Sequence, residues 1–403
     1  MAKKKNKKIS PLLTAFLSFV SIILGFAIGL IAPLYLAEGR FTANITTDEL
    51  LDTSIAYHSN EDHHPHFAEV NVDDADIAVH FIELGNKYTG DCTLIKVGDV
   101  EILIDCGSRA DSVRTVSEYV NNYVTDGILE YAIVTHAHQD HYAGFATSTK
   151  ADSIFDLYEC RTIITFAKTN QKETNTTYKN YTRELKDEIA NGAVHYTADN
   201  CYDNKDGAKR IYSLGAGYDL EILYNKYYWE SATTENDYSV CCMITGNGKN
   251  FLFTGDFEKA GEEALAEKYK ADHAGLDFTS FKVDLYKAGH HGSKTSSNDK
   301  FLAVFKPQVC YVCCCAGSPE YTKTVANQFP TQDFIDRISA YTDKVYVTTL
   351  CIDYDKNEFE SFNGNIIVLV KGSNLDVKCS NNDILLKDTD WFKNSRKCPT
   401  AWN

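Results

Sequence analysis

Residues 131–144 read YAIVTHAHQDHYAG, an apolar run followed at once by three histidines and an aspartate. The apolar run is short, bounded and contains β-branched residues, which predicts a buried strand. The polar residues then fall on one short loop at the end of that strand. Their order predicts that His136 and His138 converge on one ion, while Asp140 and His141 face a second ion beside it. Imidazole and carboxylate ligands suit Zn²⁺ and neighbouring transition metals.

Two further strand ends carry the same kinds of side chain. Asp256 follows the apolar run 251–253 through Thr-Gly, so its carboxylate is placed to bridge two cations. His290 leaves the strand predicted at 283–288 in the same manner, within the sequence GHHGS. Isolated buried carboxylates are costly. Three strand ends that deliver His, Asp and His therefore predict a metal centre.

These blocks resemble the metallo-β-lactamase superfamily, together with the opening sequences HFIELG at 80–85 and LIDCG at 103–107. Within that superfamily the pattern is most similar to the soluble domain of the ComEC family of DNA-internalisation competence proteins. The resemblance covers roughly residues 79–369. It implies an α/β fold, the αββα sandwich of the metallo-β-lactamases, in which two packed sheets carry helices on their outer faces.

The resemblance also implies two divalent transition-metal ions, zinc or manganese. It implies these ligands: His136 and His138 for metal 1, Asp140, His141 and His290 for metal 2, and Asp256 as the bridge. His291 is not expected to be a ligand, because adjacent side chains rarely both turn inward. Two such ions would lower the pKa of a shared water to near neutrality and so make hydroxide available. Asp140 would orient that nucleophile as the catalytic carboxylate.

Two features depart from the family pattern. The multi-helix channel that accompanies the domain in ComEC has no counterpart in this sequence. The third imidazole that hydrolytic members often supply to metal 1 is not evident either. His195, the only histidine between the metal loop and Asp256, is expected to be an ordinary loop residue. Asn236 or Asp237 is the alternative at that place.

The residues around His290 indicate the substrate. Ser293, Lys294 and Ser296, with Lys287 ahead of them, form a cationic and hydroxyl cluster of the kind that holds phosphate oxygens. We therefore expect a phosphodiesterase or nuclease-like enzyme that acts on nucleic acid or on a wall or lipid phosphodiester. The alternatives are a carbonyl hydrolase for a lactone, thioester or β-lactam, and a non-catalytic envelope protein. The complete set of metal-type residues argues against the last, whereas the fold alone does not separate the first two.

The N-terminal sequence predicts a membrane anchor. Residues 1–10 form a basic tail with five lysines, and residues 11–37 carry no charge. The second segment is apolar and long enough to cross about 30 Å of hydrocarbon as a helix. Lysines ahead of an uncleaved helix predict a single-pass protein of the cell membrane with an extracellular catalytic domain. The Gly-x-x-x-Gly pattern at 25–29 is compatible with a homodimer through this helix.

The remaining boundaries follow from composition. Residues 38–76 are polar and acidic, which predicts a linker; 77–372 form the hydrolase domain and 373–403 a C-terminal extension. Without the five N-terminal lysines the chain has 35 basic and 56 acidic residues, a formal charge of −21. Such a body repels polyanions overall, so a phosphate substrate must meet the metals and a local basic patch.

Thirteen cysteines are present, most of them inside apolar runs, which predicts buried strand thiols. Only Cys379 and Cys398 are predicted as an exposed pair. The cysteines therefore indicate no particular redox compartment.

Overall fold

Two eight-stranded β-sheets organise residues 70–403, the part of the chain that the computed structural model describes. The strands of the first sheet are β1 (Ile77–Phe81), β2 (Thr93–Val97), β3 (Val100–Ile104), β4 (Ile128–Val134), β5 (Glu159–Thr165), β6 (Val194–Thr197), β15 (Ile366–Lys371) and β16 (Asn374–Cys379). Their spatial order is β16-β15-β1-β2-β3-β4-β5-β6. The first three strands along the chain pair antiparallel.

The second sheet is built almost entirely from the later half of the chain. Its strands are β7 (Ile211–Gly215), β8 (Tyr218–Ile222), β9 (Cys242–Gly246), β10 (Lys249–Phe253), β11 (Leu285–Lys287), β12 (Cys310–Ala316), β13 (Val345–Asp353) and β14 (Glu358–Ser361). They lie in the order β14-β13-β12-β11-β10-β9-β8-β7. One hydrophobic cluster contains inward-facing residues of both sheets, among them Phe81 and Tyr311, whose rings stack at 4.5 Å.

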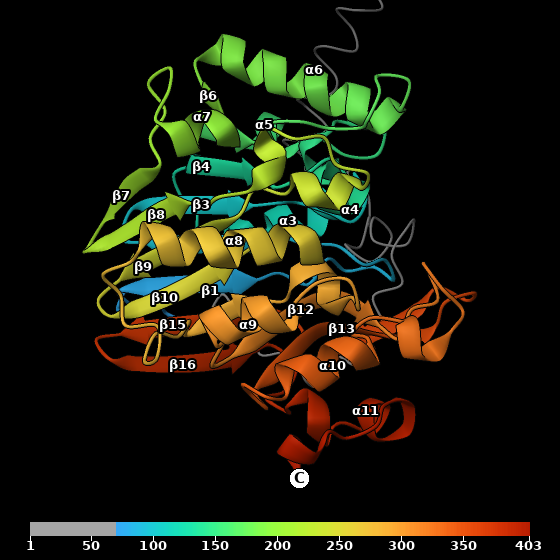
Figure 1. Cartoon of the computed structure of the whole chain (residues 1–403). Helices are drawn as coiled ribbons and strands as arrows, with labels where there is room; N and C mark the ends of the chain where they lie inside the picture. The colour runs from blue at the N-terminus through green and yellow to red at the C-terminus, as the bar shows by residue number, and fades with distance from the viewer. Residues whose placement is uncertain (1–69) are drawn as a thin grey trace, which may run out of the picture. The chain divides into compact units, whose positions relative to one another are not determined.

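Helices cover the outer faces of the sheets (Figure 1). They are α3 (Ser112–Val120), α4 (Gln139–Tyr142), α5 (Ile154–Leu157), α6 (Thr176–Asn191), α7 (Ala198–Asp203), α8 (Lys259–Asp272), α9 (Asp299–Phe305), α10 (Gln332–Ile338) and α11 (Asp390–Ser395). Apolar residues of α8, α9 and α10 share a buried cluster with β9 to β13, whereas those of α3, α5 and α6 belong to the cluster of the first sheet. The predicted αββα sandwich is confirmed.

Parallel pairing brings distant strand ends to the same edge. β3, β4, β5 and β6 run parallel to one another, and so do β10, β11, β12 and β13. The carboxyl ends of parallel strands meet at one edge of a sheet, where ligands of α/β proteins commonly bind. The loops after β4, β10 and β11 carry the metal-type residues of the sequence. The topology therefore sets the position of the site.

The segment predicted as a C-terminal extension packs on this fold. β16 pairs along the whole of β15, which makes it the edge strand of the first sheet. Trp402 is buried, and its Nε1 donates to the carbonyl oxygen of Thr342 at 2.9 Å. Arg396 donates from Nε to the carbonyl oxygen of Pro330 at 3.0 Å and from Nη2 to that of Gln328 at 2.7 Å. The C-terminal residues thus stabilise the loop that precedes α10 through hydrogen bonds to its backbone.

All thirteen cysteines lie within the described residues, and all are free. Eleven are buried, as the sequence predicts. The exposed pair is wrong, because Cys379 is buried at the end of β16 and only Cys398 is exposed. The basic tail 1–10, the predicted membrane helix 11–37 and most of the linker lie outside the described residues. Within residues 70–403 no helix combines the length and apolarity that a membrane span needs.

Candidate metal centre

The loop that follows β4 is clamped by the end of β3. The Asp105 carboxylate accepts hydrogen bonds from the backbone N and the Oγ1 of Thr135, both at 2.7 Å, and lies 2.8 Å from Nδ1 of His141. Gly107 passes so close that a Cβ atom there would lie 1.7 Å from the carbonyl oxygen of Asp140. Only glycine fits such an approach. The positions of the histidines on this loop are therefore fixed by contacts between two strand ends.

His136 and His138 turn ring nitrogens toward each other, as the sequence predicts. Nε2 of His136 lies 3.1 Å from Nδ1 of His138. On its other side, Nδ1 of His136 lies 3.2 Å from Oγ1 of Thr135 and 3.4 Å from Oγ of Ser239. Both hydroxyls can accept a hydrogen from Nδ1, which leaves Nε2 free to bind a cation. This pair can therefore hold one ion.

Asp256 contacts both this pair and a second group of histidines, His141 and His291. Its carboxylate is almost fully buried, with Oδ1 3.2 Å from Nε2 of His141. Oδ2 lies 3.4 Å from Nε2 of His291 and 3.9 Å from Nε2 of His136. One carboxylate thus contacts histidines of both groups, which is the arrangement that a bridging ligand needs.

The hydrogen bonds of His141 and His291 show that the donor set fits a metal ion. Nδ1 of His141 faces the carboxylate of Asp105, and Nδ1 of His291 faces the carbonyl oxygen of Cys313 at 2.9 Å. Both partners only accept, so each Nδ1 carries a hydrogen, and each ring in its neutral form presents a lone pair at Nε2. The two Nε2 atoms lie 3.3 Å apart. Lone pairs at this distance require a cation or further protons between them.

The local charges also favour a cation. Burial lowers the pKa of His141, but the surrounding carboxylates, Asp256 first, outweigh burial and raise it to about 10. The same balance raises the pKa of His291 well above its ordinary value. Burial likewise raises the pKa of Asp256, but His141 and His291 outweigh it and hold that pKa well below the usual range. The site therefore carries an excess of negative charge that a divalent ion would offset.

A buried ion pair lies behind the histidines. The Lys287 Nζ contacts the carboxylate of Asp91, which lies 3.2 Å from Nδ1 of His291 and 3.6 Å from Nδ1 of His141. Asp91, His141, Asp256 and His291 are all buried, and their ligand-type atoms lie within 4.8 Å of one another. Asp91 faces the Nδ1 side of both rings, whereas Asp256 faces the Nε2 side. Asp91 is therefore placed to orient the two histidines, and Lys287 pairs with Asp91 rather than facing a substrate.

The adjacent histidines of η5 (Gly289–Gly292) face different ways. Both have φ in the left-handed region, 48° and 53°, which turns the chain sharply. His291 is buried in the cluster, whereas the His290 side chain is 20% exposed at its edge. Nε2 of His290 lies 3.8 Å from Oδ2 of Asp256, and its Nδ1 lies 3.4 Å from Oε1 of Glu258. The sequence predicts His290 as the ligand and not His291, whereas His291 is the residue buried among the ligand-type groups. The left-handed turn, which the periodicity of the sequence does not reveal, is the physical reason.

The predicted substrate-binding residues divide into two groups. Ser296 is fully buried, and its Oγ donates to the carbonyl oxygen of Phe257 at 2.6 Å, so this hydroxyl serves the fold and the prediction for it is wrong. Ser293 is also buried, with its Oγ 3.1 Å from Oγ1 of Thr295. Lys294 is exposed, and its Nζ lies 3.5 Å from Oδ1 of Asn327. Of these residues, Lys294 presents a charged group to solvent.

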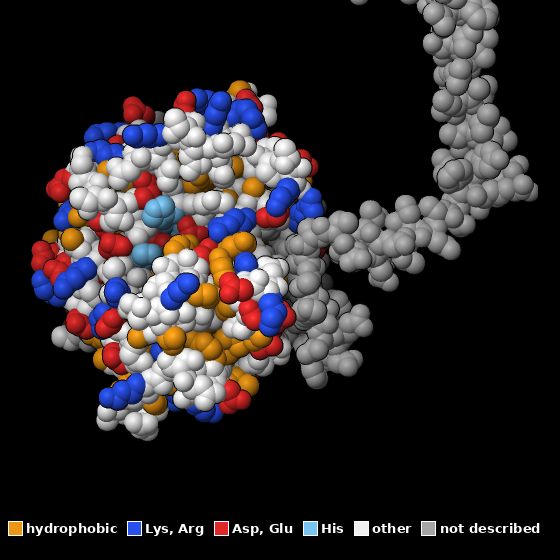
Figure 2. Space-filling view, turned by 90° about the vertical axis from the view of Figure 1, so that its right-hand side faces the viewer, with side chains coloured by type: hydrophobic (Ala, Val, Ile, Leu, Met, Phe, Trp, Pro, Cys, Tyr) orange, Lys and Arg blue, Asp and Glu red, His pale blue; other side chains and the backbone are white. Residues whose placement is uncertain are grey.

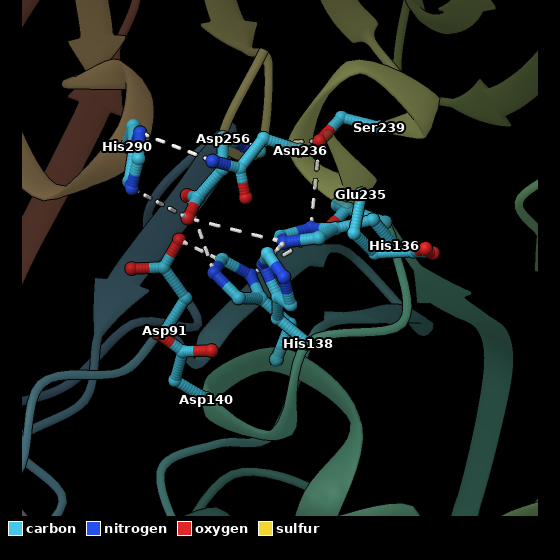
Figure 3. A network of polar contacts seen from close by, with 12 residues as sticks. Asp91, His136, His138, Asp140, Glu235, Asn236, Ser239, Asp256 and His290 are labelled. Atoms are coloured by element: carbon cyan, nitrogen blue, oxygen red, sulfur yellow. Dashed lines mark hydrogen bonds and ion pairs between the residues drawn. The ribbon is translucent and has the colours of Figure 1, made fainter. Parts of the chain in front are cut away.

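His195 lies apart from this cluster. It belongs to β6 rather than to a loop, and its Nε2 lies 2.9 Å from Oγ1 of Thr165 on the neighbouring strand. Asn236 and Asp237 lie on the short helix η4 (Glu235–Tyr238), and both are buried. Figure 3 shows Asn236 next to Asp256. The structure thus brings Asn236, and not His195, to the metal-type residues.

Three residues of the site were not predicted from the sequence. Asp105 lies in the LIDCG block that supports the family resemblance, and Asp91 follows Gly90 ahead of β2, but neither was predicted to have a role. Tyr321 lies on the loop after β12, and its hydroxyl donates to Oδ2 of Asp140 at 2.9 Å. Asp91 lies just ahead of β2 and Asp105 directly after β3, and an aspartate next to a buried strand is the signal that could have indicated both. Nothing in the sequence around Tyr321 indicates its contact.

Residues 85–191 match the family model described as the metallo-beta-lactamase superfamily. With the two packed sheets and the His/Asp cluster, the chain therefore contains a domain of this superfamily, whose fold is generally that of metal-dependent hydrolases.

Its curated relatives are of the ComEC type, which confirms the narrower resemblance. The chain is 32% identical over 83 residues to ComE operon protein 3 of Bacillus subtilis, a match that covers 21% of this chain and 9% of that protein. It is 28% identical over 127 residues to Recombination protein 2 of Haemophilus influenzae, covering 31% of this chain and 14% of that protein. The matches thus span only a small part of the relatives' length.

Two solved structures are distantly similar. The metallo-β-lactamase fold protein YhfI of Bacillus subtilis is 14% identical with a TM-score of 0.30, over 53% of this chain and 71% of that one. The short form of human tRNase Z is 13% identical with a TM-score of 0.35, over 73% of this chain and 99% of that one. Likenesses at this level carry no information on substrate.

Proposed function

We propose that the chain is a metal-dependent phosphodiester hydrolase that acts on nucleic acid or on a wall or lipid phosphodiester. The observation that carries the proposal is the convergence of buried histidines on the carboxylate of Asp256, beside a rim that is open to solvent. Figure 2 shows exposed histidine side chains next to acidic ones on one face of the domain, with lysines and arginines nearby.

The ligands that we propose differ from the sequence prediction at one position. We assign them as follows: His136 and His138 to one ion, Asp140, His141 and His291 to the other, and Asp256 between them. Zinc or manganese held there would supply Lewis-acid activation of water and of the scissile group. His290 stays at the rim, where it borders the substrate side.

Asp140 has the proposed catalytic role. Its Oδ2 accepts a hydrogen bond from Tyr321 and lies 3.4 Å from Nε2 of His291. Tyr321 thereby fixes the direction of the carboxylate, so that its oxygens can orient the attacking water and accept its proton. Lys294 is the group that would contact a phosphoryl oxygen of the substrate.

Two observations support a phosphodiester over a carbonyl substrate. The curated relatives are of the ComEC type, and the name of one of them places that protein in recombination. In addition, Lys294, an exposed cationic side chain, follows His291 by three residues in a chain with a net negative charge. A neutral carbonyl substrate would not need such a group.

Hydrolysis rates on a small panel of substrates test the proposal. Purified chain is incubated with an aryl phosphodiester, single-stranded DNA and a set of lactones, with Asp256→Asn as the matched variant. We expect hydrolysis of a phosphodiester that chelation and Asp256→Asn both abolish. Turnover of lactones alone would replace the proposal by the carbonyl alternative.

We also propose that the domain is held outside the cell by the helix predicted at 11–37, where two chains could pair. The support is the lysine cluster ahead of this apolar segment. Protease added to intact cells should release the domain. If the domain is degraded only after the cells are broken, the orientation is wrong.

A further inference from the structure

We propose that Asn236 is a metal ligand, whose side-chain oxygen completes the coordination of the ion held by His136 and His138. This inference rests on the metal centre proposed above. The Asn236 side chain is buried, with 5% of its surface exposed, and its Oδ1 has no hydrogen-bond partner among the described residues. A buried amide oxygen without a partner costs free energy. Nδ2 of the same amide lies 3.4 Å from Nδ1 of His290, and Figure 3 shows Asn236 next to Asp256. A buried oxygen without a partner at such a place is a candidate for cation binding.

The orientation of the amide follows from its neighbour. Nδ2 of Asn236 lies 2.9 Å from Oε1 of Glu258. A carboxylate only accepts hydrogen bonds, so the nitrogen must face Glu258 and the oxygen must face the other way. Figure 3 shows the oxygen turned toward the cluster that contains Asp256 and His136.

The other candidates for this position have partners of their own. Oδ1 of Asp237 accepts a hydrogen bond from the backbone N of Glu258 at 3.4 Å. His195 is bound to Thr165 within the first sheet. The His136–His138 pair therefore has Asn236 as its available third donor among these residues.

An amide oxygen in this position affects which cation binds. Oxygen is a harder ligand than imidazole and suits Mn²⁺ better, whereas a site of imidazoles favours Zn²⁺. The neutral oxygen also adds no charge to the site. We therefore expect the ion at His136 and His138 to be held more weakly than the ion at His141 and His291, and this weaker site to tolerate Mn²⁺.

Metal titration of the full chain tests the assignment without reference to activity. Metal-free protein is titrated with Mn²⁺, with free Mn²⁺ followed by electron paramagnetic resonance, and bound metal is checked by elemental analysis. The variants are Asn236→Ala and a double variant, Asn236→Asp with Glu258→Gln, in which the new amide at position 258 can donate to the new carboxylate. Asn191→Ala at the exposed end of α6 is the matched control. Circular dichroism reports whether each variant is folded.

We expect two bound equivalents in the wild type and in Asn191→Ala. Asn236→Ala should weaken one equivalent by at least about tenfold. The double variant, which keeps an oxygen at position 236 and an amide donor opposite it, should retain both. If Asn236→Ala binds both equivalents as tightly as the wild type, or if the folded double variant loses one, the assignment is wrong. A chain that shows this dependence on Asn236 but hydrolyses no phosphodiester would retain the assignment and lose the proposed function.

Discussion

The substitution Asp105→Asn should weaken metal binding although Asp105 is not itself a proposed ligand. In the structure its carboxylate accepts from the backbone N and Oγ1 of Thr135 and from Nδ1 of His141. The amide of asparagine can keep the hydrogen bond from the Thr135 N, but its NH₂ group then faces His141. Two donors cannot face each other, so the hydrogen on His141 must move from Nδ1 to Nε2. That places it where the ion should bind.

The magnitude follows from the loss of one such supporting contact. Removing the outer partner of a ligating histidine typically lowers metal affinity by about 10- to 100-fold, which corresponds to about 1.4–2.7 kcal/mol. The metal-free protein should also lose about 1–3 kcal/mol of its free energy of unfolding, because the buried Oγ1 of Thr135 loses the oxygen to which it donates. The two effects are measured separately.

Competition with a chromophoric zinc chelator gives the dissociation constant, and denaturant unfolding of metal-free protein gives stability. Asp284→Asn is the matched control. Asp284 is buried just ahead of β11 and accepts from the backbone N of Asn250 and from Nζ of Lys249, both at 3.1 Å, at the strand end away from the site. The Asp284→Asn variant should lose stability but bind zinc as tightly as the wild type. If Asp105→Asn binds zinc as tightly as the wild type, the orienting role of Asp105 is wrong.

Four further substitutions distinguish residues of the site from residues outside it. His291→Ala should remove an equivalent of bound metal, as judged by elemental analysis, whereas His290→Ala should retain both, because only His291 is buried among the ligands; equal metal content in the two variants would contradict this. Gly107→Ala should lower the melting temperature and metal content together, since a Cβ atom there collides with the Asp140 carbonyl; a variant with wild-type stability would refute the close approach. His195→Ala should leave metal content and turnover nearly unchanged, and a large loss of either would show that His195 is a ligand.

The sequence predicted the features that depend on local pattern. Apolar runs that end in His, Asp or Gly-His identify strands with polar side chains at their carboxyl ends. If these strands pair in parallel, their carboxyl ends meet at one edge of the sheet, so the site can be predicted from local patterns. His136, His138, Asp140 and His141 were found because they share one loop. Asp256 was found because a carboxylate directly after a buried strand is costly unless it has a partner.

What the sequence did not reveal depends on contacts between distant segments. The choice between His290 and His291 is set by two left-handed residues, which side-chain patterns do not indicate. The partner of Tyr321 lies 181 residues away at Asp140. Ser296 was predicted to face a substrate because hydroxyls beside a histidine suggest a site, but the carbonyl oxygen of Phe257 takes its hydrogen bond.

Elemental analysis of the purified full chain at neutral pH, paired with phosphodiesterase rates before and after chelation, tests the central claim most directly. The account predicts about two divalent transition-metal ions per folded chain. It also predicts loss of hydrolysis when a chelator removes them and recovery when zinc or manganese is restored. A folded wild-type chain that binds no transition metal under these conditions would contradict it.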